Sequence, residues 1–193
     1  EVDDYVVRKL LSRHEEFFQK NVLGRDVFLT FRVPNPSVER EEAKVLLETL
    51  ESIPRSFDVA RSFDSNGSDS AGSADTCAPV FEAILPMTSS AAELNRVYHY
   101  YRDFVAGKEG KPLFDTTLGE WSGKFEPKQI NVIPLFETKE QMLSSPAIIE
   151  EYLKGKDLDV IRVFLARSDP ALNYGSLAAV LLNKVAVQRL YDL

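Results

Sequence analysis

Polar or charged side chains stand at the ends of four apolar runs of the sequence, where each run gives way to turn residues. Together these four ends carry Arg32, Met87, Thr88, Glu137, Arg167, Ser168 and Asp169. The carboxylates Glu137 and Asp169, with no histidine or cysteine nearby, suit a hard cation such as Mg²⁺ or Mn²⁺. The arginines Arg32 and Arg167 suit a phosphate or carboxylate held by a planar fork. These residue types therefore predict an anionic, phosphorylated substrate held beside a metal ion.

The same charged residues also have a purely structural interpretation, because a single arginine or aspartate after a strand often forms a loop salt bridge or caps a helix. The two histidines, His14 and His99, fall within predicted helices, so we expect them on helix surfaces and away from the strand ends. Cys77 is the only cysteine, which excludes an internal disulfide and a metal site built from cysteines.

Four strand-then-helix units are predicted to position the charged residues. The strands are 27–33, 78–87, 131–136 and 160–166. Such alternation is typical of parallel strands joined by crossover helices, and the near-continuous apolar runs predict strands covered on both faces. The site is then expected at the C-terminal ends of the strands. The units fit an open doubly wound sheet or half of a (β/α)₈ barrel, and the absence of a GxGxxG turn argues against dinucleotide binding.

Local signals mark the boundaries of these units. Ser90 with Glu93, and Thr138 with Gln141, form the pattern of a capping box at two helix starts, and a helix is expected to restart at Pro146. The segment 62–76 is rich in Ser, Asp, Gly and Ala, which predicts a mobile loop. Residues 108–128 are predicted to be irregular, with Trp121, the single tryptophan, as a packing anchor.

Composition narrows the class of protein further. The 193 residues, 44% of them hydrophobic, fit a single domain or a large piece of one. The net charge of −7 and the scattered basic residues argue against nucleic-acid binding. No apolar run is long enough to span a membrane, and no signal peptide is visible, so we predict a cytoplasmic protein with no membrane partner. Because the chain starts at Glu1 without a methionine and ends inside a predicted helix, we expect residues 1–193 to be one partial domain of a longer protein.

Four stretches of the sequence resemble the short, archaeal-type phosphoenolpyruvate carboxylases. They are LTFRVPNPSVEREEAKVLLETLESIPRS (29–56), FEAILPMTSS (81–90), NVIPLFET (131–138) and RVFLARSDPALNYG (162–175). The longer bacterial and plant enzymes share PLFET and the spacing of Ser168, Asp169 and Gly175. The resemblance covers nearly the whole chain apart from the Ser/Gly loop, and it implies an α/β fold made of four consecutive βα units of a (β/α)₈ TIM-type barrel.

The resemblance also implies roles for the residues at the strand ends. Through the PLFET match, Glu137 takes the place of one metal-binding carboxylate, and Asp169 takes the place of the other, with Mg²⁺ or Mn²⁺ as the cofactor. Arg32 resembles the arginine that faces the substrate phosphate. Arg167 stands where the longer enzymes have an uncharged residue, and Leu172 stands where they carry a lysine.

The reaction implied by the resemblance converts phosphoenolpyruvate and bicarbonate into oxaloacetate and phosphate, through carboxyphosphate and the enolate of pyruvate. The family's His-Pro motif and its Gly/Arg-rich loop have no counterpart in these residues. We therefore expect the segment to be inactive alone and the full-length enzyme to be a homo-oligomer.

Two alternatives stay open beside the carboxylase. One is another Mg²⁺-dependent barrel lyase or aldolase that acts on pyruvate or phosphoenolpyruvate. The other is a non-catalytic barrel segment that binds a phosphorylated metabolite, in which Arg32 and Arg167 hold the anion without a metal.

Overall fold

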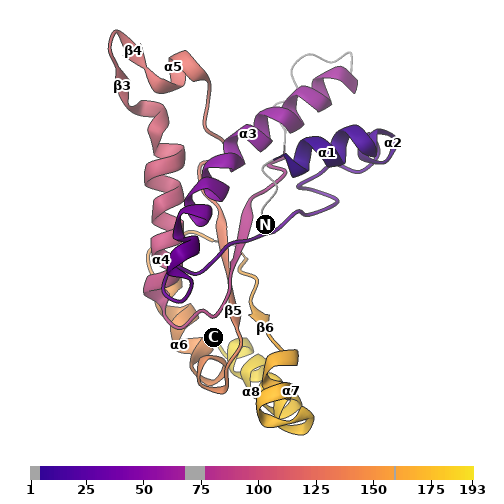
Figure 1. Cartoon of the computed structure of the whole chain (residues 1–193), viewed down its shortest axis with the longest axis vertical. Helices are drawn as coiled ribbons and strands as arrows, with labels where there is room; N and C mark the ends of the chain where they lie inside the picture. Colours follow the sequence, from indigo (N-terminus) through magenta and orange to yellow (C-terminus); the bar gives the residue numbers. More distant parts are fainter. Residues whose placement is uncertain (1–4, 68–76, 159) are drawn as a thin grey trace.

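Four parallel strands form the central sheet of the protein (Figure 1). The structure is a computed structural model that describes residues 5–67, 77–158 and 160–193. The strands are β1 (Phe31–Arg32), β2 (Glu82–Leu85), β5 (Asn131–Phe136) and β6 (Phe164–Leu165), in the spatial order β1-β2-β5-β6. Each strand lies beside the strand of this sheet that follows it along the chain. The described residues form an open sheet and not a closed barrel. The predicted α/β class with parallel strands and crossover helices is confirmed.

Helices make up most of the remaining structure. They are α1 (Val6–Arg13), α2 (Glu15–Phe18), η1 (Arg40–Glu42), α3 (Ala43–Gly67), α4 (Ala91–His99), η2 (Tyr100–Val105), η3 (Ala106–Gly110), α5 (Leu118–Ser122), α6 (Lys139–Leu153), α7 (Ser168–Tyr174) and α8 (Ser176–Tyr191). The capping boxes predicted at Ser90 and Thr138 are both present, at the starts of α4 and α6. The predicted restart at Pro146 is wrong, because α6 runs through this proline without interruption.

Helices cover one face of the sheet. Contacts link α4 and α6 to β5 and to each other, while α3 contacts η2 and α8 contacts α6. Alternate strand residues point to this side and are buried in the core. They are Phe31, Val33, Ala83, Leu85, Val132 and Phe136. Large helix residues such as Leu94, Tyr101 and Tyr152 fill the space against them.

The opposite face of the strands is more polar. Arg32 is exposed on it and its neighbour Ile84 is only partly buried, whereas Ile133, the next residue across the sheet, is fully buried. Glu82 is nearly inaccessible, at 1% exposure, and its carboxylate accepts hydrogen bonds from the Thr30 hydroxyl and from the Arg162 guanidinium. The strands were predicted to be covered on both faces, but within the described ranges the helices cover one face and this polar network occupies part of the other.

Residues 106–128 form an arm at the end of α4 and η2, on the side of the sheet away from α6 and α7 (Figure 1). The predicted irregular structure of 108–128 is confirmed for 123–128 and is wrong for 112–122, because β3 (Pro112–Leu113) pairs with β4 (Thr116–Thr117) in an antiparallel hairpin that leads into α5. Trp121 is 72% exposed on this arm and is not a packing anchor.

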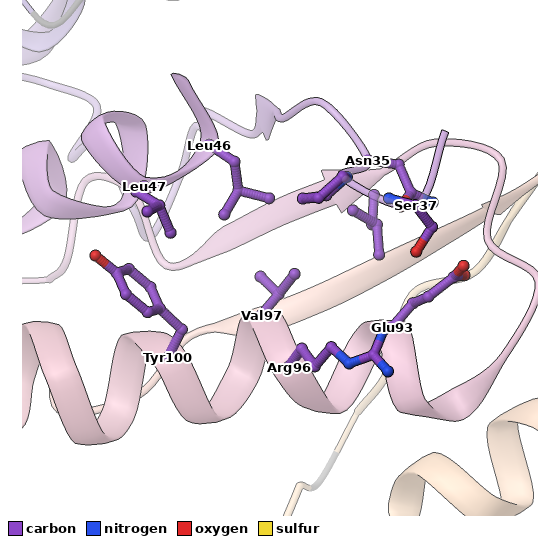
Figure 2. Close-up of a pocket in the computed structure, with 10 residues that line it drawn as sticks. Asn35, Ser37, Leu46, Leu47, Glu93, Arg96, Val97 and Tyr100 are labelled. Atoms are coloured by element: carbon purple, nitrogen blue, oxygen red, sulfur yellow. The ribbon is translucent and has the colours of Figure 1, made fainter. Parts of the chain in front are cut away.

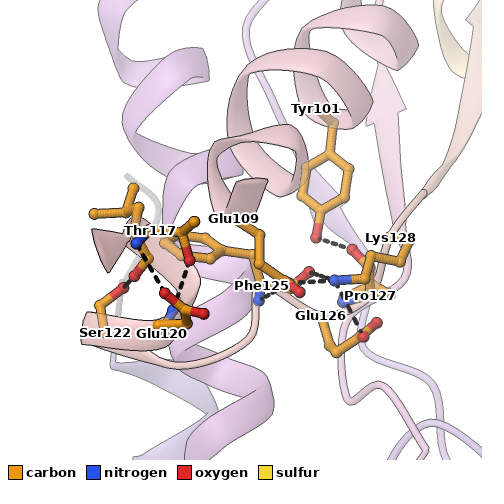
Figure 3. A network of polar contacts seen from close by, with 10 residues as sticks. Tyr101, Glu109, Thr117, Glu120, Ser122, Phe125, Glu126, Pro127 and Lys128 are labelled. Atoms are coloured by element: carbon orange, nitrogen blue, oxygen red, sulfur yellow. Dashed lines mark hydrogen bonds and ion pairs between the residues drawn. The ribbon is translucent and has the colours of Figure 1, made fainter. Parts of the chain in front are cut away.

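Polar contacts close the base of the arm on itself and attach it to the buried Tyr101 of η2 (Figure 3). The Glu109 carboxylate accepts hydrogen bonds from the Phe125 backbone N–H at 2.9 Å and from the Lys128 ammonium. The hydroxyl of the buried Tyr101 donates to the Pro127 carbonyl at 2.7 Å. Burial raises the pKa of Tyr101, so this hydroxyl stays protonated and able to donate. The arm is therefore held at its base, while its tip is exposed.

Several boundaries differ from the sequence prediction. Helix α3 continues to Gly67, so the first six residues of the predicted loop 62–76 are helical, and 68–76 lie outside the described residues. Strands β1, β2 and β6 are shorter than the predicted runs 27–33, 78–87 and 160–166. Strands β1 and β6 each have one neighbour in the sheet, so fewer of their backbone groups find a partner. Among the described helices, none combines the length and apolarity needed to cross a bilayer.

Removing the guanidinium that faces Glu82 is expected to destabilise the protein. Arg162→Met leaves a carboxylate at 1% exposure with the Thr30 hydroxyl as its remaining donor, which costs about 1–3 kcal/mol of unfolding free energy. Urea unfolding followed by far-UV circular dichroism measures this cost. The control is Arg167→Met, an exposed arginine, for which we expect a change within about 0.5 kcal/mol. Equal stability of the two variants would contradict the prediction.

Candidate functional site

The C-terminal ends of β2, β5 and β6 lie side by side at one edge of the sheet. Phe136 of β5 pairs with Leu165 of β6, and the Ala166 N–H continues this pairing by donating to the Phe136 carbonyl at 2.9 Å. On the other side of β5, the Thr88 N–H donates to the Leu135 carbonyl at 3.1 Å. The residues that follow these three strands are therefore neighbours, as expected for a parallel sheet.

Glu137 is half-buried at this edge and has one carboxylate oxygen tied to the backbone. Its Oε2 accepts a hydrogen bond from the Met87 N–H at 2.6 Å. Its Oε1 accepts none from any residue that the structure describes. Met87 has a φ of 50°, a left-handed conformation that few non-glycine residues adopt and that here accompanies the turn of its N–H toward Glu137.

Gln141, in the first turn of α6, forms hydrogen bonds with the backbone of both Glu137 and Met87. Its Oε1 accepts from the backbone N–H of Glu137 at 2.9 Å and of Thr138 at 3.1 Å. Its Nε2 donates to the Met87 carbonyl at 3.3 Å. The sequence indicated Gln141 as a capping residue, but its second contact, across to the end of β2, left no sequence signal.

Asn35 lies in the loop between β1 and α3 and is 1% exposed. Its Nδ2 donates to the Pro86 carbonyl at 2.9 Å, and its Oδ1 accepts from the Ser37 N–H at 3.0 Å. Its backbone N–H donates to Glu39 Oε2 at 3.0 Å. The sequence prediction missed Asn35, although asparagine between two prolines is itself a turn signal.

Asp169 and Arg167 follow β6 and are exposed. Arg167 occupies the N-cap position of α7, and Asp169 lies in the first turn of that helix, where a carboxylate interacts favourably with the helix dipole. Asp169 Oδ2 accepts a hydrogen bond from the Ser168 hydroxyl at 3.1 Å. Leu172 is 86% exposed on the same helix.

Arg32 lies on the same face of the sheet as Glu137 but not at the same level. It pairs with Ile84, which pairs with Ile133, and Ile133 precedes Glu137 by four residues along β5. The structure thus places Glu137, Arg167 and Asp169 at adjacent strand ends, whereas Arg32 lies further back along the strands.

The groups that could bind a cation at the strand ends are carboxylates, and they do not form a complete set of metal ligands by themselves. Within the described ranges, no three His, Cys, Asp or Glu residues cluster as metal ligands. Glu137 and Asp169 come from neighbouring strand ends, and Mg²⁺ commonly takes one or two carboxylates and completes its shell with water and substrate oxygens. His99 lies on α4, where its Nδ1 is 3.5 Å from Asp103 Oδ2, and His14 is exposed, so neither histidine stands at the strand ends.

A pocket of about 200 Å³ lies behind the strand ends, between the β1–α3 loop and α4 (Figure 2). Its walls are mainly apolar and include Leu46 and Val97, while Asn35 lines it on the side of the loop. Tyr100 closes one end and donates its hydroxyl to Glu51 at 2.9 Å. Burial and this carboxylate raise the pKa of Tyr100 to about 12. The pocket belongs to the helix side, opposite the face that carries Glu137.

Loss of the Gln141 side chain is expected to weaken the fold at this edge. Gln141→Ala removes the acceptor for two backbone N–H groups and the donor to Met87, which costs about 1–2 kcal/mol of unfolding free energy. Urea unfolding followed by circular dichroism provides the measurement. Gln188→Ala, on the exposed surface of α8, is the matched control and is expected to change stability by less than about 0.5 kcal/mol. Similar values for the two variants would show that the contacts of Gln141 add nothing.

Comparison with known proteins identifies relatives over the full length of the chain. A family model described as phosphoenolpyruvate carboxylase matches residues 1–193. The chain is 57% identical over 193 residues to a phosphoenolpyruvate carboxylase of Methanospirillum hungatei, which covers 99% of this chain. It is 58% identical over 194 residues to the protein of that name from Methanothermobacter thermautotrophicus and 55% identical over 194 residues to that from Halobacterium salinarum, each covering 100% of this chain. The chain spans 38% of the length of each of these three relatives.

Proposed function

This chain belongs to the phosphoenolpyruvate carboxylase family, and we propose that it is one part of a longer enzyme that converts phosphoenolpyruvate and bicarbonate into oxaloacetate and phosphate. The observation that carries the proposal is the match of the whole chain to this family. The half-buried carboxylate of Glu137 at the end of a parallel strand supports it, because this fold class keeps its chemistry at that edge.

In the proposed site, Glu137 and Asp169 hold Mg²⁺ or Mn²⁺ from two adjacent strand ends. The Oε1 atom of Glu137 is the oxygen left for the cation, since Oε2 is bonded to the Met87 N–H. Asp169 is exposed, and its single side-chain contact is with a hydroxyl group, so it can turn toward a ligand at low cost. A bound divalent cation supplies positive charge that stabilises negative charge developing on phosphoryl and enolate oxygens.

The two arginines are proposed to bind the anionic groups of the substrate. Arg167 stands beside Asp169 at the start of α7, where its guanidinium is exposed. Arg32 is exposed on the same face of the sheet as Glu137, at the level of Ile133, four residues before Glu137. A planar guanidinium can form two parallel hydrogen bonds with a phosphate or carboxylate and so fix its orientation.

We further propose that the four βα units form part of a (β/α)₈ TIM-type barrel. The uninterrupted strand order and the helices on one face support this over a doubly wound sheet, in which the order reverses and helices cover both faces. Helix α8 also exposes a set of apolar side chains that a following unit would cover. They are Leu177, Leu181, Val185 and Tyr191. A homo-oligomeric state and a cytoplasmic location stay predictions.

Loss of either proposed metal ligand is expected to remove most of the activity of the full-length enzyme. Glu137→Gln and Asp169→Asn should each lower turnover by about 100-fold or more, because the charge that the cation supplies to the transition state is lost. Incorporation of labelled bicarbonate into oxaloacetate, with release of phosphate, measures turnover. Glu140→Gln, on the exposed surface of α6, serves as the control.

The same assay separates the alternatives. Absence of label from the product of the wild-type enzyme would favour a lyase or aldolase acting on pyruvate or phosphoenolpyruvate. Unchanged Mn²⁺ affinity in both carboxylate variants would favour a segment that binds an anion without a metal.

The barrel proposal predicts that α8 is buried in the longer protein. Leu181, which is 54% exposed here, is then expected to contact a following unit, so Leu181→Lys should cost about 1–3 kcal/mol of stability in the full-length protein. Thermal unfolding compares it with Lys184→Ala, a change at an exposed position of the same helix. If Leu181→Lys is as stable as the control, this face of α8 remains in solvent and the proposed packing is wrong.

A further inference from the structure

We propose that Asn35 is a positioning residue for Glu137 and that it acts through the backbone of Met87. The inference rests on the proposed role of Glu137 as a metal ligand. It adds a residue from the end of β1 to a site otherwise built from the ends of β5 and β6. Asn35 does not reach the carboxylate itself, so its contribution is the geometry of the turn that follows β2.

The first step is the attachment of Asn35 to that turn. The side chain is 1% exposed and uses both ends of its amide: Nδ2 donates to the Pro86 carbonyl and Oδ1 accepts from the Ser37 N–H. A buried amide with both groups bonded has one orientation, since turning it would leave a buried donor and a buried acceptor unpaired. The Pro86 carbonyl is therefore fixed relative to the loop after β1.

The second step is the direction of the Met87 N–H. The carbonyl of Pro86 and the N–H of Met87 belong to the same planar peptide group, so fixing one also fixes the other. That N–H donates to Glu137 Oε2 at 2.6 Å. The Met87 carbonyl is held separately by Gln141 Nε2 at 3.3 Å. Met87 thus keeps its φ of 50° because the peptide groups on both sides of its Cα are bonded to other elements.

The consequence concerns how Glu137 meets a cation. With Oε2 bonded to an amide, Oε1 is the carboxylate oxygen that accepts no hydrogen bond from the described residues, and a cation would be favoured at this oxygen. Hydrogen bonds to the second oxygen of a ligating carboxylate commonly set its orientation, and losing such an outer contact costs about 10–100-fold in metal affinity. In this arrangement, Asn35 determines whether the Met87 N–H is available to Glu137.

The test is Mn²⁺ binding to the full-length protein, followed by electron paramagnetic resonance of the free ion. Asn35→Ala and Asn35→Ser are both expected to weaken Mn²⁺ binding about tenfold, because neither side chain carries an amide donor for Pro86. The serine variant keeps a hydroxyl acceptor for the Ser37 N–H, so it preserves the turn if the alanine variant does not fold. Saturating Mn²⁺ should restore turnover to within about threefold of wild type.

The matched control is Thr49→Val, which removes a side-chain hydrogen bond from another residue that is 1% exposed, within α3. It is expected to lower stability while leaving the Mn²⁺ affinity within about twofold of wild type. If Glu137→Gln weakens Mn²⁺ binding but both Asn35 variants bind as wild type, the positioning role is wrong and the metal site stands. If Glu137→Gln itself binds Mn²⁺ normally, the proposed metal site is wrong. Activity that high Mn²⁺ fails to restore would also overturn the role of Asn35.

Discussion

The parallel pairing of β2, β5 and β6 is the constraint on which the site depends. Parallel strands bring their C-terminal ends to one edge, and the bond from Thr88 to Leu135 and the bond from Ala166 to Phe136 extend this pairing past the last regular residues. Glu137 and Arg167 therefore follow adjacent strand ends although they are far apart in sequence. In the described part of the chain, the helices stabilise this arrangement from one side, through a core in which Phe136 contributes a fully buried side chain directly before Glu137. Phe136 in the core and Glu137 in the site are thus consecutive, so the packing of Phe136 also fixes the position of Glu137.

The two carboxylates at this edge differ in how firmly they are held. Glu137 is half-buried, with its backbone N–H and one carboxylate oxygen both hydrogen-bonded. Asp169 is exposed at the start of a seven-residue helix and contacts one neighbouring hydroxyl. In the proposed metal site, the first would define where a cation sits, and the second would adapt to it. This division suits a cation that also takes oxygen ligands from a substrate, since one side of its coordination shell has to change during binding.

Sequence patterns predicted the features that depend on residues close in the chain. The capping boxes at Ser90 and Thr138 and the strand 131–136 need only local information, and all three are present. The α/β class was predicted from the repeated strand-then-helix units. The family suggested by the resemblance is the one that the comparisons identify. The contacts of Asn35 with Pro86 and of Gln141 with Met87 join segments about fifty residues apart, so no local pattern could indicate them. The hairpin in the arm was missed because its strands have two residues each, too few to show a period.

The position of Trp121 has a consequence for spectroscopy. It is the only tryptophan of the chain, and it is largely exposed on α5, which lies in the arm at the opposite end of the molecule from α7 (Figure 1). Its intrinsic fluorescence therefore reports the surroundings of α5 and is insensitive to loss of packing around Phe136 or Tyr152. An emission shift on assembly or ligand addition would locate an event at the arm, on the side of the molecule opposite the proposed site. The single tryptophan of this chain thus monitors a surface that takes no part in the proposed chemistry.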